Sequence, residues 1–239
     1  MKLLIINNRN SEALEGLVKS LHENIQGNWT HCTFDATGTL PRGGESNVTG
    51  SGNLKEWVLS NLKGETDDLY AVIDENKIAV GAINVDKIEE AMSDHEIFCF
   101  SLALGKNITF CSNMGCENIL KPIGEKDGII KWDWSLHYMD FGYPLNLDGT
   151  VFRGKEFSKL IRNVSFSDTL ELENGLQIFD DYPKNVMAAF SEGKMIEIVF
   201  ENPNLRVTFD HEKLEKDRTK YQILDKHENP DKVSDEVEA

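Results

Sequence analysis

Three consecutive oxygen-bearing side chains, Asp74, Glu75 and Asn76, follow an apolar run in residues 69–73. Carboxylate and amide oxygens at positions i and i+2, with a third between them, are suitable ligands for Mn²⁺ or Mg²⁺. A cation held in this way keeps open positions for diphosphate oxygens and stabilises the charge of a nucleoside diphosphate leaving group. The same triplet is also typical of an ordinary turn, so it indicates a metal site only together with other evidence.

A second block, residues 129–153, interleaves aromatic rings, carboxylates and glycines. Rings stack on the apolar face of a pyranose and carboxylates bind its hydroxyls, so this composition suits a saccharide site. The alternative is that the rings fill a core, that Asp148 and Gly149 form a tight turn and that Arg153 pairs with a helix carboxylate. The apolar neighbours of His137 favour a packed or loop histidine over an acid or base.

The elements that would position these groups alternate between strand and helix patterns. Residues 2–6 and 69–73 are apolar runs typical of buried strands. The alternation predicts an α/β fold with a mostly parallel central sheet flanked by helices, in which ligands bind beyond the carboxyl ends of the strands. Residues 7–10 and 74–76 are expected at that edge. Further helices are predicted near residues 14–25, 54–62, 87–96 and 152–161, strands at 97–104 and 194–200, and a glycine-rich loop at 37–52.

Composition and charge narrow the class of protein. The 239 residues, 40% of them hydrophobic, are enough for one main domain with a substantial core. The first apolar run is too short for a signal peptide and no later run would span a bilayer, so we expect a cytoplasmic protein. A net charge of −16 disfavours non-specific binding to nucleic acid or an anionic membrane. Motifs of P-loop hydrolases, dinucleotide-binding dehydrogenases and serine hydrolases are absent.

The cysteines and the C-terminal residues carry weaker signals. The four cysteines are sparse and are expected to be free thiols, and Cys111 and Cys116 lack the spacing of a zinc site. Residues 210–239 are highly charged and poor in apolar side chains, which predicts a solvated tail that is helical or disordered.

Several segments together resemble a family of bacterial and phage glycosyltransferase-like proteins with the single-Rossmann GT-A fold. The motif Lys-Trp-Asp-Trp is followed by Asp-Phe-Gly-Tyr-Pro-Leu-Asn-Leu-Asp-Gly-Thr-Val-Phe-Arg. The likeness is collinear over residues 1–209, which we take as a GT-A-like domain. Its segments are residues 6–9, 98–107, 131–134, 140–153 and 202–207.

The resemblance implies roles for individual residues. Asn7, Asn8 and Arg9 would hold the nucleotide base or diphosphate, with the Arg9 guanidinium as a phosphate partner. Family members usually have a run of aspartates where this chain has Asp74, Glu75 and Asn76, so the amide of Asn76 removes one charge from the metal site.

On the acceptor side, the resemblance makes Asp148 the candidate general base, with Asp140 second. Either carboxylate can instead bind a sugar hydroxyl. The substrate-binding residues would be Trp132, Trp134, Tyr143 and Arg153.

The resemblance therefore implies a glycosyltransferase that moves a sugar from a nucleotide-diphosphate donor to a saccharide or other hydroxyl acceptor, with Mn²⁺ or Mg²⁺ as cofactor. The alternative is a catalytically silent module of the same fold that binds a nucleotide or saccharide.

Overall fold

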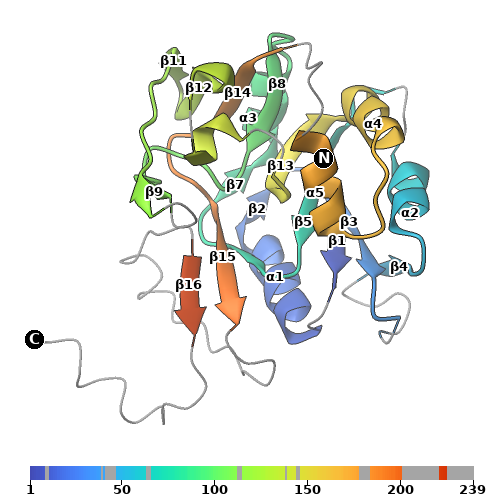
Figure 1. Ribbon diagram of the computed structural model, residues 1–239. Coiled ribbons are helices and arrows are strands. Elements are labelled where there is room, and N and C mark those ends of the chain that lie inside the picture. Colours follow the sequence, from blue (N-terminus) through green and yellow to red (C-terminus); the bar gives the residue numbers. More distant parts are fainter. Residues whose placement is uncertain are drawn as a thin grey trace, which may run out of the picture.

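The computed structural model of the protein describes residues 1–8, 11–38, 40, 47–62, 66–111, 115–137, 139–143, 146–177, 184–200 and 221–224. A nine-stranded sheet forms its centre, in the order β11-β12-β14-β8-β13-β5-β1-β3-β4 (Figure 1). Strands β12 and β13 run against the other seven, so the sheet is mostly parallel. This arrangement confirms the predicted α/β fold. The strand bounds are β1 Lys2–Asn7, β3 Thr30–Asp35, β4 Val48–Gly50, β5 Leu69–Asp74, β8 Ile97–Ser101, β11 Gly124–Lys126, β12 Ile129–Asp133, β13 Asp148–Arg153 and β14 Val186–Phe190.

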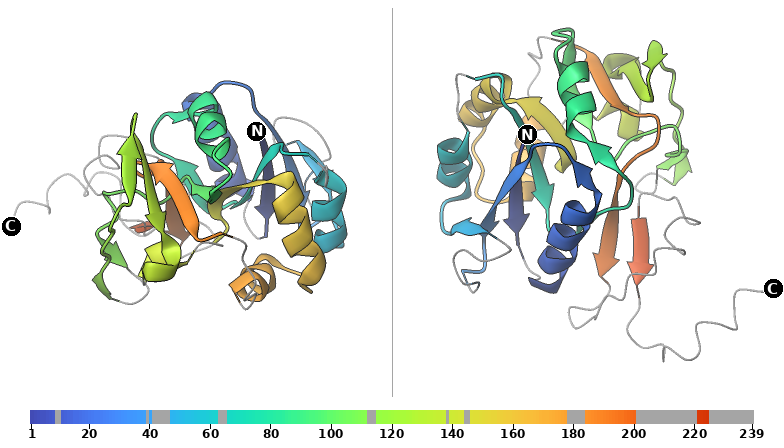
Figure 2. Two further views of the ribbon diagram at one scale, coloured as in Figure 1. Left: turned by 90° about the horizontal axis from the view of Figure 1, so that it is seen from above. Right: turned by 180° about the vertical axis from the view of Figure 1, so that it is seen from behind.

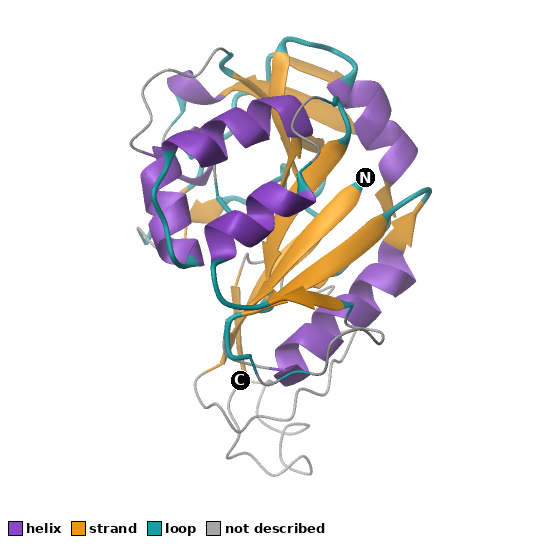
Figure 3. Ribbon diagram, turned by 90° about the vertical axis from the view of Figure 1, so that its right-hand side faces the viewer, coloured by secondary structure: helices purple, strands orange, loops and turns teal. Residues whose placement is uncertain are grey.

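Helices cover both faces of the sheet (Figure 3). Because successive strand residues point to opposite faces, Leu4 and Ile6 of β1 join the core with α2, α4 and α5, whereas Leu3 and Ile5 join the core with α1 and α3. Burial on both faces explains why β1 and β5 are continuous apolar runs. The helix bounds are α1 Ser11–Asn24, α2 Leu54–Asn61, α3 Val85–Met92, α4 Gly154–Asn163 and α5 Thr169–Gln177, with short 3-10 helices η1 Trp134–Leu136 and η2 Met139–Gly142.

The helix predicted from residue 152 begins two residues later. Phe152 and Arg153 belong to β13, and α4 starts at Gly154. The preceding Thr150 and Val151 are β-branched, which favours an extended conformation. At Gly154 the backbone lies so close to the ring of Tyr70 that an added Cβ would be 2.7 Å from it. The first two residues of the predicted helix therefore belong to the end of β13.

Three small sheets complete the fold. β15 and β16 lie side by side in Figures 1 and 2, and β15 also pairs with β6. The strand predicted at residues 194–200 is β15, whereas β16 lies where a helix or disorder was predicted. The rest of that tail and the boundary at residue 209 lie outside the described residues. The bounds are β2 Ile25–Gln26, β6 Lys77–Ala79, β7 Ile83–Asn84, β9 Phe110–Cys111, β10 Cys116–Glu117, β15 Met195–Phe200 and β16 Tyr221–Leu224.

Among the described helices, none has the length and apolar character needed to span a membrane.

Candidate functional site

Four neighbouring strands bring polar residues to one edge of the central sheet. Asn7 at the end of β1 pairs in register with Asp35 at the end of β3. On the other side of β1, Asp74 at the end of β5 pairs with the residue before Asn7. Asp148, the first residue of the antiparallel strand β13, pairs with the residue before Asp74. The edge expected from the sequence to carry Asn7 and Asp74 therefore also carries Asp35 and the backbone of Asp148.

Asn7 and Asp35 form a buried pair at this edge. Each side chain is only 1% exposed, and Asn7 Nδ2 donates to Asp35 Oδ1 over 3.0 Å. This bond fixes the orientation of the amide, whose Oδ1 is buried and has no hydrogen-bond partner among the residues that the structure describes. A buried acceptor without a partner costs free energy and calls for an explanation, such as a water or a ligand donor. The pair can therefore accept an N–H or O–H group from a bound molecule.

Asp35 also organises the loop that follows β3. Its carboxylate accepts from the Thr37 hydroxyl at 2.6 Å and from the backbone N–H groups of Thr37 and Leu40 at 3.2 and 2.8 Å. Burial alone would raise the pKa of Asp35. The hydrogen bonds from Thr37, Leu40 and Asn7 outweigh burial and lower the pKa, so the carboxylate stays ionised.

Sequence reasoning missed Asp35. The available signal was an acidic residue directly after the run Thr33-Phe34 and shortly before Gly38, a pattern typical of a strand followed by a turn.

Of the two predicted site residues that follow Asn7, the structure describes Asn8 and not Arg9. Asn8 Nδ2 donates to the Thr169 hydroxyl over 3.3 Å, which ties the end of β1 to the start of α5. Arg9, the predicted phosphate partner, lies outside the described residues. Asn8 is thus placed beside the strand-end pair, and the role of Arg9 stays a prediction.

The three residues of the predicted metal triplet differ in burial and in hydrogen-bond partners. Asp74 is partly exposed and Glu75 is buried. The side-chain amide of Asn76 donates to Glu197 Oε1 over 2.8 Å, and Lys77 forms an ion pair with the other oxygen of Glu197, also at 2.8 Å. Within the described part of the chain, no group of three or more His, Cys, Asp or Glu side chains is placed to hold a metal. Asp74 is thus the more accessible of the two carboxylates.

Asp140 lies in a separate buried cluster. It is 7% exposed, and its Oδ2 accepts from Asn118 Nδ2 over 3.0 Å. Its Oδ1 lies 3.7 Å from the Sγ of Cys111, whose thiol points a weak hydrogen bond at it. The structure gives no register link between Asp140 and the strand-end residues. Of the two candidate bases, Asp148 is the one whose backbone pairs with β5 next to Asp74.

The aromatic residues of the block divide between core and surface. Trp132 has no exposed surface, and its Nε1 donates to the carbonyl of Phe141 over 2.9 Å. This placement supports the core-packing alternative, because no ring face is open to a ligand. Trp134 and Tyr143 are partly exposed, and Trp134 Nε1 donates to the carbonyl of Lys184 over 3.3 Å. Of the three rings predicted to stack on a sugar, Trp134 and Tyr143 therefore offer surface to a saccharide.

His137 supports the local structure of the same block. Its Nδ1 lies 2.7 Å from the carbonyl of Asp133, and its Nε2 accepts from the backbone N–H of Lys121 over 2.9 Å. Because Nε2 accepts, Nδ1 carries the proton and the ring is neutral in this arrangement. The predicted packed or loop histidine agrees with these contacts.

Arg153 lies at the opposite edge of the sheet from Asp148, since β13 runs the full distance between the two. Its guanidinium is 3% exposed and donates to the carbonyls of Met92, Asp94 and Ile97. It also forms an ion pair with Glu156 at 3.2 Å. Arg153 thus stabilises the fold and lies apart from the strand-end residues. Its ion pair with Glu156 agrees with the alternative that Arg153 pairs with a helix carboxylate.

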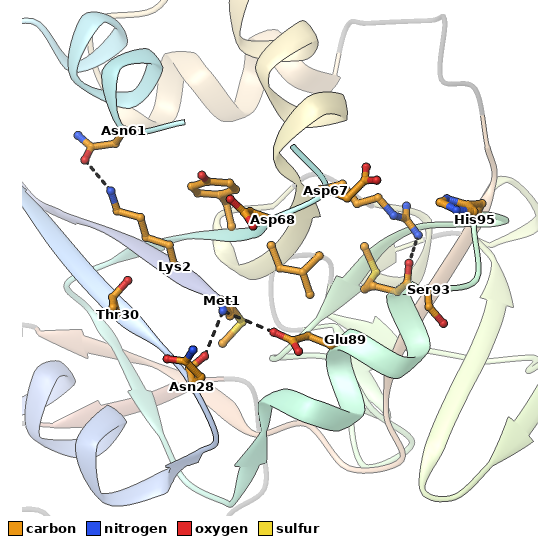
Figure 4. A pocket seen from close by; sticks show the side chains of 14 residues that line it. Met1, Lys2, Asn28, Thr30, Asn61, Asp67, Asp68, Glu89, Ser93 and His95 are labelled. Atoms are coloured by element: carbon orange, nitrogen blue, oxygen red, sulfur yellow. Dashed lines mark hydrogen bonds and ion pairs between the residues drawn. The ribbon is translucent and has the colours of Figure 1, made fainter. Parts of the chain in front are cut away.

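A cavity of about 770 Å³ also lies at this opposite edge (Figure 4). It is lined by Lys2, Asp68 and Arg153, among others, and by none of the strand-end residues Asn7 and Asp74. Lys2 Nζ donates across its wall to Asn61 Oδ1 over 2.9 Å. Ligands of parallel sheets bind beyond the carboxyl ends of the strands. We therefore take the strand ends, and not this cavity, as the candidate site.

Comparisons with known proteins give only a distant likeness. A scan against models of protein families finds no match. A search of curated proteins finds no match either. Among solved structures, the chain is similar to S. aureus TarS. TarS residues 1–349 with UDP gives a TM-score of 0.46 at 13% identity, over 82% of this chain and 59% of that chain.

Two further TarS structures give similar values. TarS itself has a TM-score of 0.45 at 11% identity, over 81% of this chain and 36% of that chain. TarS residues 1–349 with UDP-GlcNAc has a TM-score of 0.43 at 11% identity, over 95% and 60%. This chain thus spans less than two thirds of each TarS chain. Such a likeness assigns no activity, which has to be inferred from the site itself.

Proposed function

We propose that the chain transfers a sugar from a nucleotide-diphosphate donor to a hydroxyl acceptor, with the site at the carboxyl edge of β1, β3 and β5. The observation that carries this proposal is the convergence of Asn7, Asp35, Asp74 and Asp148 through the register of four adjacent strands. Such an edge is where α/β sheets bind nucleotides. The sequence resemblance to GT-A glycosyltransferases selects sugar transfer among the reactions that a nucleotide site can support.

In this proposal Asn7 and Asp35 recognise the nucleoside. Asp35 holds the Asn7 amide by its nitrogen, which leaves the buried Oδ1 to accept an N–H of the base or a hydroxyl of the ribose. Because the amide is already oriented, binding costs little ordering entropy. The Asp35 carboxylate also accepts from Thr37 in the loop after β3. Loss of this carboxylate would therefore disturb both the Asn7 amide and the loop.

A divalent cation would be held mainly by Asp74, the partly exposed carboxylate of the triplet, with Glu75 beside it. The residues fit a cation only in part, since Asn76 contributes an uncharged amide where a carboxylate would add a charge. The bound cation would neutralise the diphosphate.

Asp148 is the proposed general base. Its backbone lies next to the end of β5, and a carboxylate there would take the proton of the attacking hydroxyl. Trp134 and Tyr143, which are both partly exposed, would supply ring surface for the acceptor.

A second candidate function is favoured by the contacts of Asn76. An amide in place of a carboxylate, hydrogen-bonded to Glu197 beside the Lys77 ion pair, leaves few metal ligands at the triplet. A catalytically silent module that binds a nucleotide or saccharide fits this observation as well. A silent module that binds a nucleotide differs from the transferase in turnover alone, whereas one that binds a saccharide differs in nucleotide binding as well.

A thermal-shift screen tests the proposal. UDP-, GDP-, ADP-, CMP- and TDP-linked sugars are each added with Mn²⁺ or EDTA, with UDP-GlcNAc in the panel. A ligand at about 100 times its dissociation constant adds about 2.7 kcal/mol of stability, or roughly 5–10 °C in a chain of this size. A shift with one nucleotide family that is lost in EDTA and in Asp74→Asn supports the metal-dependent transferase. A shift unaffected by EDTA supports a metal-independent or silent site, and no shift contradicts nucleotide binding.

A further inference from the structure

Cys111 and Cys116 face each other in a two-stranded antiparallel sheet. They are register partners in the β9–β10 pair, next to the partners Phe110 and Glu117. Cα atoms of directly opposed residues in such a pair are about 4.5 or 5.5 Å apart, and both values lie within the range of about 4.4–6.8 Å found in disulfides. Opposed residues also project from the same face of the pair. The backbone therefore already has the spacing that a Cys111–Cys116 disulfide needs.

Burial in the hairpin agrees with this arrangement. Phe110 and Glu117 are exposed, whereas Cys111 is 3% exposed and Cys116 is partly exposed. The cysteines thus lie on the inner face, where Cys111 Sγ contacts Asp140 Oδ1. Cys116 is the more exposed residue of the two and Cys111 is buried, which suits an attacking and a resolving cysteine, respectively.

We propose that Cys111 and Cys116 form a redox-active dithiol that is oxidised to an intramolecular disulfide by low-molecular-weight disulfides such as oxidised glutathione. The Cys116 thiolate attacks one sulfur of the oxidant, and one glutathione leaves as a thiolate. The Cys111 thiolate then attacks the Cys116 sulfur and expels the second glutathione. The protein loses two protons and two electrons, and the oxidant is reduced to two thiols.

Oxidation also changes the surroundings of Asp140. The S–H group that contacts Oδ1 is lost, while the bond from Asn118 to Oδ2 has no need to change. The dithiol is inferred from the β9–β10 geometry and does not depend on sugar transfer. Its test uses thiol chemistry alone, so failure of the proposed function and failure of this inference are separate results.

The other two cysteines serve as internal controls. Cys32 and Cys99 are buried in the core. Burial raises the pKa of the Cys32 thiol, and it raises the pKa of Cys99 well above the usual range. Their thiolates are therefore scarce as well as inaccessible.

The test is oxidation of the folded chain with oxidised glutathione, followed by alkylation and peptide mapping. Trypsin cleaves after Lys106 and Lys126, because Pro122 blocks cleavage after Lys121, and leaves both cysteines in one peptide, residues 107–126. We expect this peptide to become lighter by two hydrogens and to resist alkylation, while Cys32 and Cys99 stay reduced. Cyanogen bromide cleavage after Met114 should leave its halves joined until a reductant is added.

Two variants test the order of steps. Cys111→Ser should accumulate a stable glutathione adduct on Cys116, because the resolving thiol is missing. Cys116→Ser should show no adduct on Cys111 under the same conditions, since that thiol is buried. A wild-type chain that accumulates the adduct without closing the disulfide, or that stays reduced at both residues, would overturn the proposal. Preferential reaction of Cys32 or Cys99 would overturn it too.

Discussion

Asn7 and Asp35 end two adjacent parallel strands as register partners, and the Asn7 amide donates to the Asp35 carboxylate over 3.0 Å. The contact determines which end of the amide is available to a ligand. With Nδ2 engaged, only Oδ1 remains, so the site selects a hydrogen-bond donor at this position.

Asn7→Ala should remove nucleotide binding with a modest effect on stability. Asp35 keeps its bonds from Thr37 and Leu40, so we expect the free energy of unfolding to fall by only about 1 kcal/mol. Nucleotide affinity, measured by calorimetry, should fall tenfold or more because the oriented acceptor is lost. Asn61→Ala at the opposite edge is the matched control. An Asn7→Ala chain that binds within about twofold of the wild type would refute the assigned role.

Asp35→Asn should lower the free energy of unfolding at pH 7. It should also make this free energy fall less on acidification than it does in the wild type. The folded-state pKa of Asp35 is lowered, below the unfolded value of about 3.9, so its contribution is fully present above that value and is lost as pH falls through the folded pKa. Urea unfolding at pH 7 should show a loss of about 1–3 kcal/mol, and the difference from wild type should shrink on acidification. Glu15→Gln, at an exposed position of α1, is the control. An equal difference at every pH would contradict the proposed origin.

Arg153→Met should be strongly destabilising and leave the ligand site intact. The change removes a buried ion-pair partner of Glu156 and leaves the carbonyls of Met92 and Ile97 without this donor. We expect a loss of about 3–5 kcal/mol in denaturant unfolding. Arg162→Met on the exposed side of α4 should stay within about 0.5 kcal/mol of the wild type. A folded Arg153→Met chain of normal stability that no longer binds nucleotide would return Arg153 to the substrate site.

His137→Ala should loosen the segment around Lys121. The imidazole accepts from the Lys121 N–H over 2.9 Å, and its other nitrogen contacts the Asp133 carbonyl. Loss of about 1 kcal/mol of local stability should speed hydrogen exchange at the Lys121 amide by about fivefold. His95→Ala, at an exposed position, should leave that amide unchanged. Unchanged exchange in His137→Ala would mean that the contact has no energetic weight.

The sequence was most informative where burial alone determines the pattern. β1 and β5 are central strands covered on both faces, so they are continuous apolar runs that end abruptly in polar residues. That abrupt end predicts that Asn7 and Asp74 lie at one edge of the sheet. The end of β3 at Asp35 could not be predicted in this way, because β3 begins with Thr30 and His31 and is less apolar than β1 and β5.

The remaining site depends on relationships that no local pattern contains. An antiparallel strand in the middle of a sheet has the same side-chain alternation as a parallel one, so the direction of β13 and the separation of Asp148 from Arg153 were not evident. Trp132 and Trp134 are two residues apart and chemically identical. They differ in exposure because Phe141 covers the first and the Lys184 carbonyl meets only the edge of the second.

β13 has a consequence for how this chain can vary. Its six residues begin at Asp148 and end at Arg153, and a strand of that length separates its ends by about 17 Å. Substitutions at residues so far apart usually have additive effects on the free energy of unfolding. A substitution at one end of β13 is then neither compensated nor worsened by a substitution at the other end. The two charges that bound one short sequence motif therefore belong to parts of the molecule that can diverge independently.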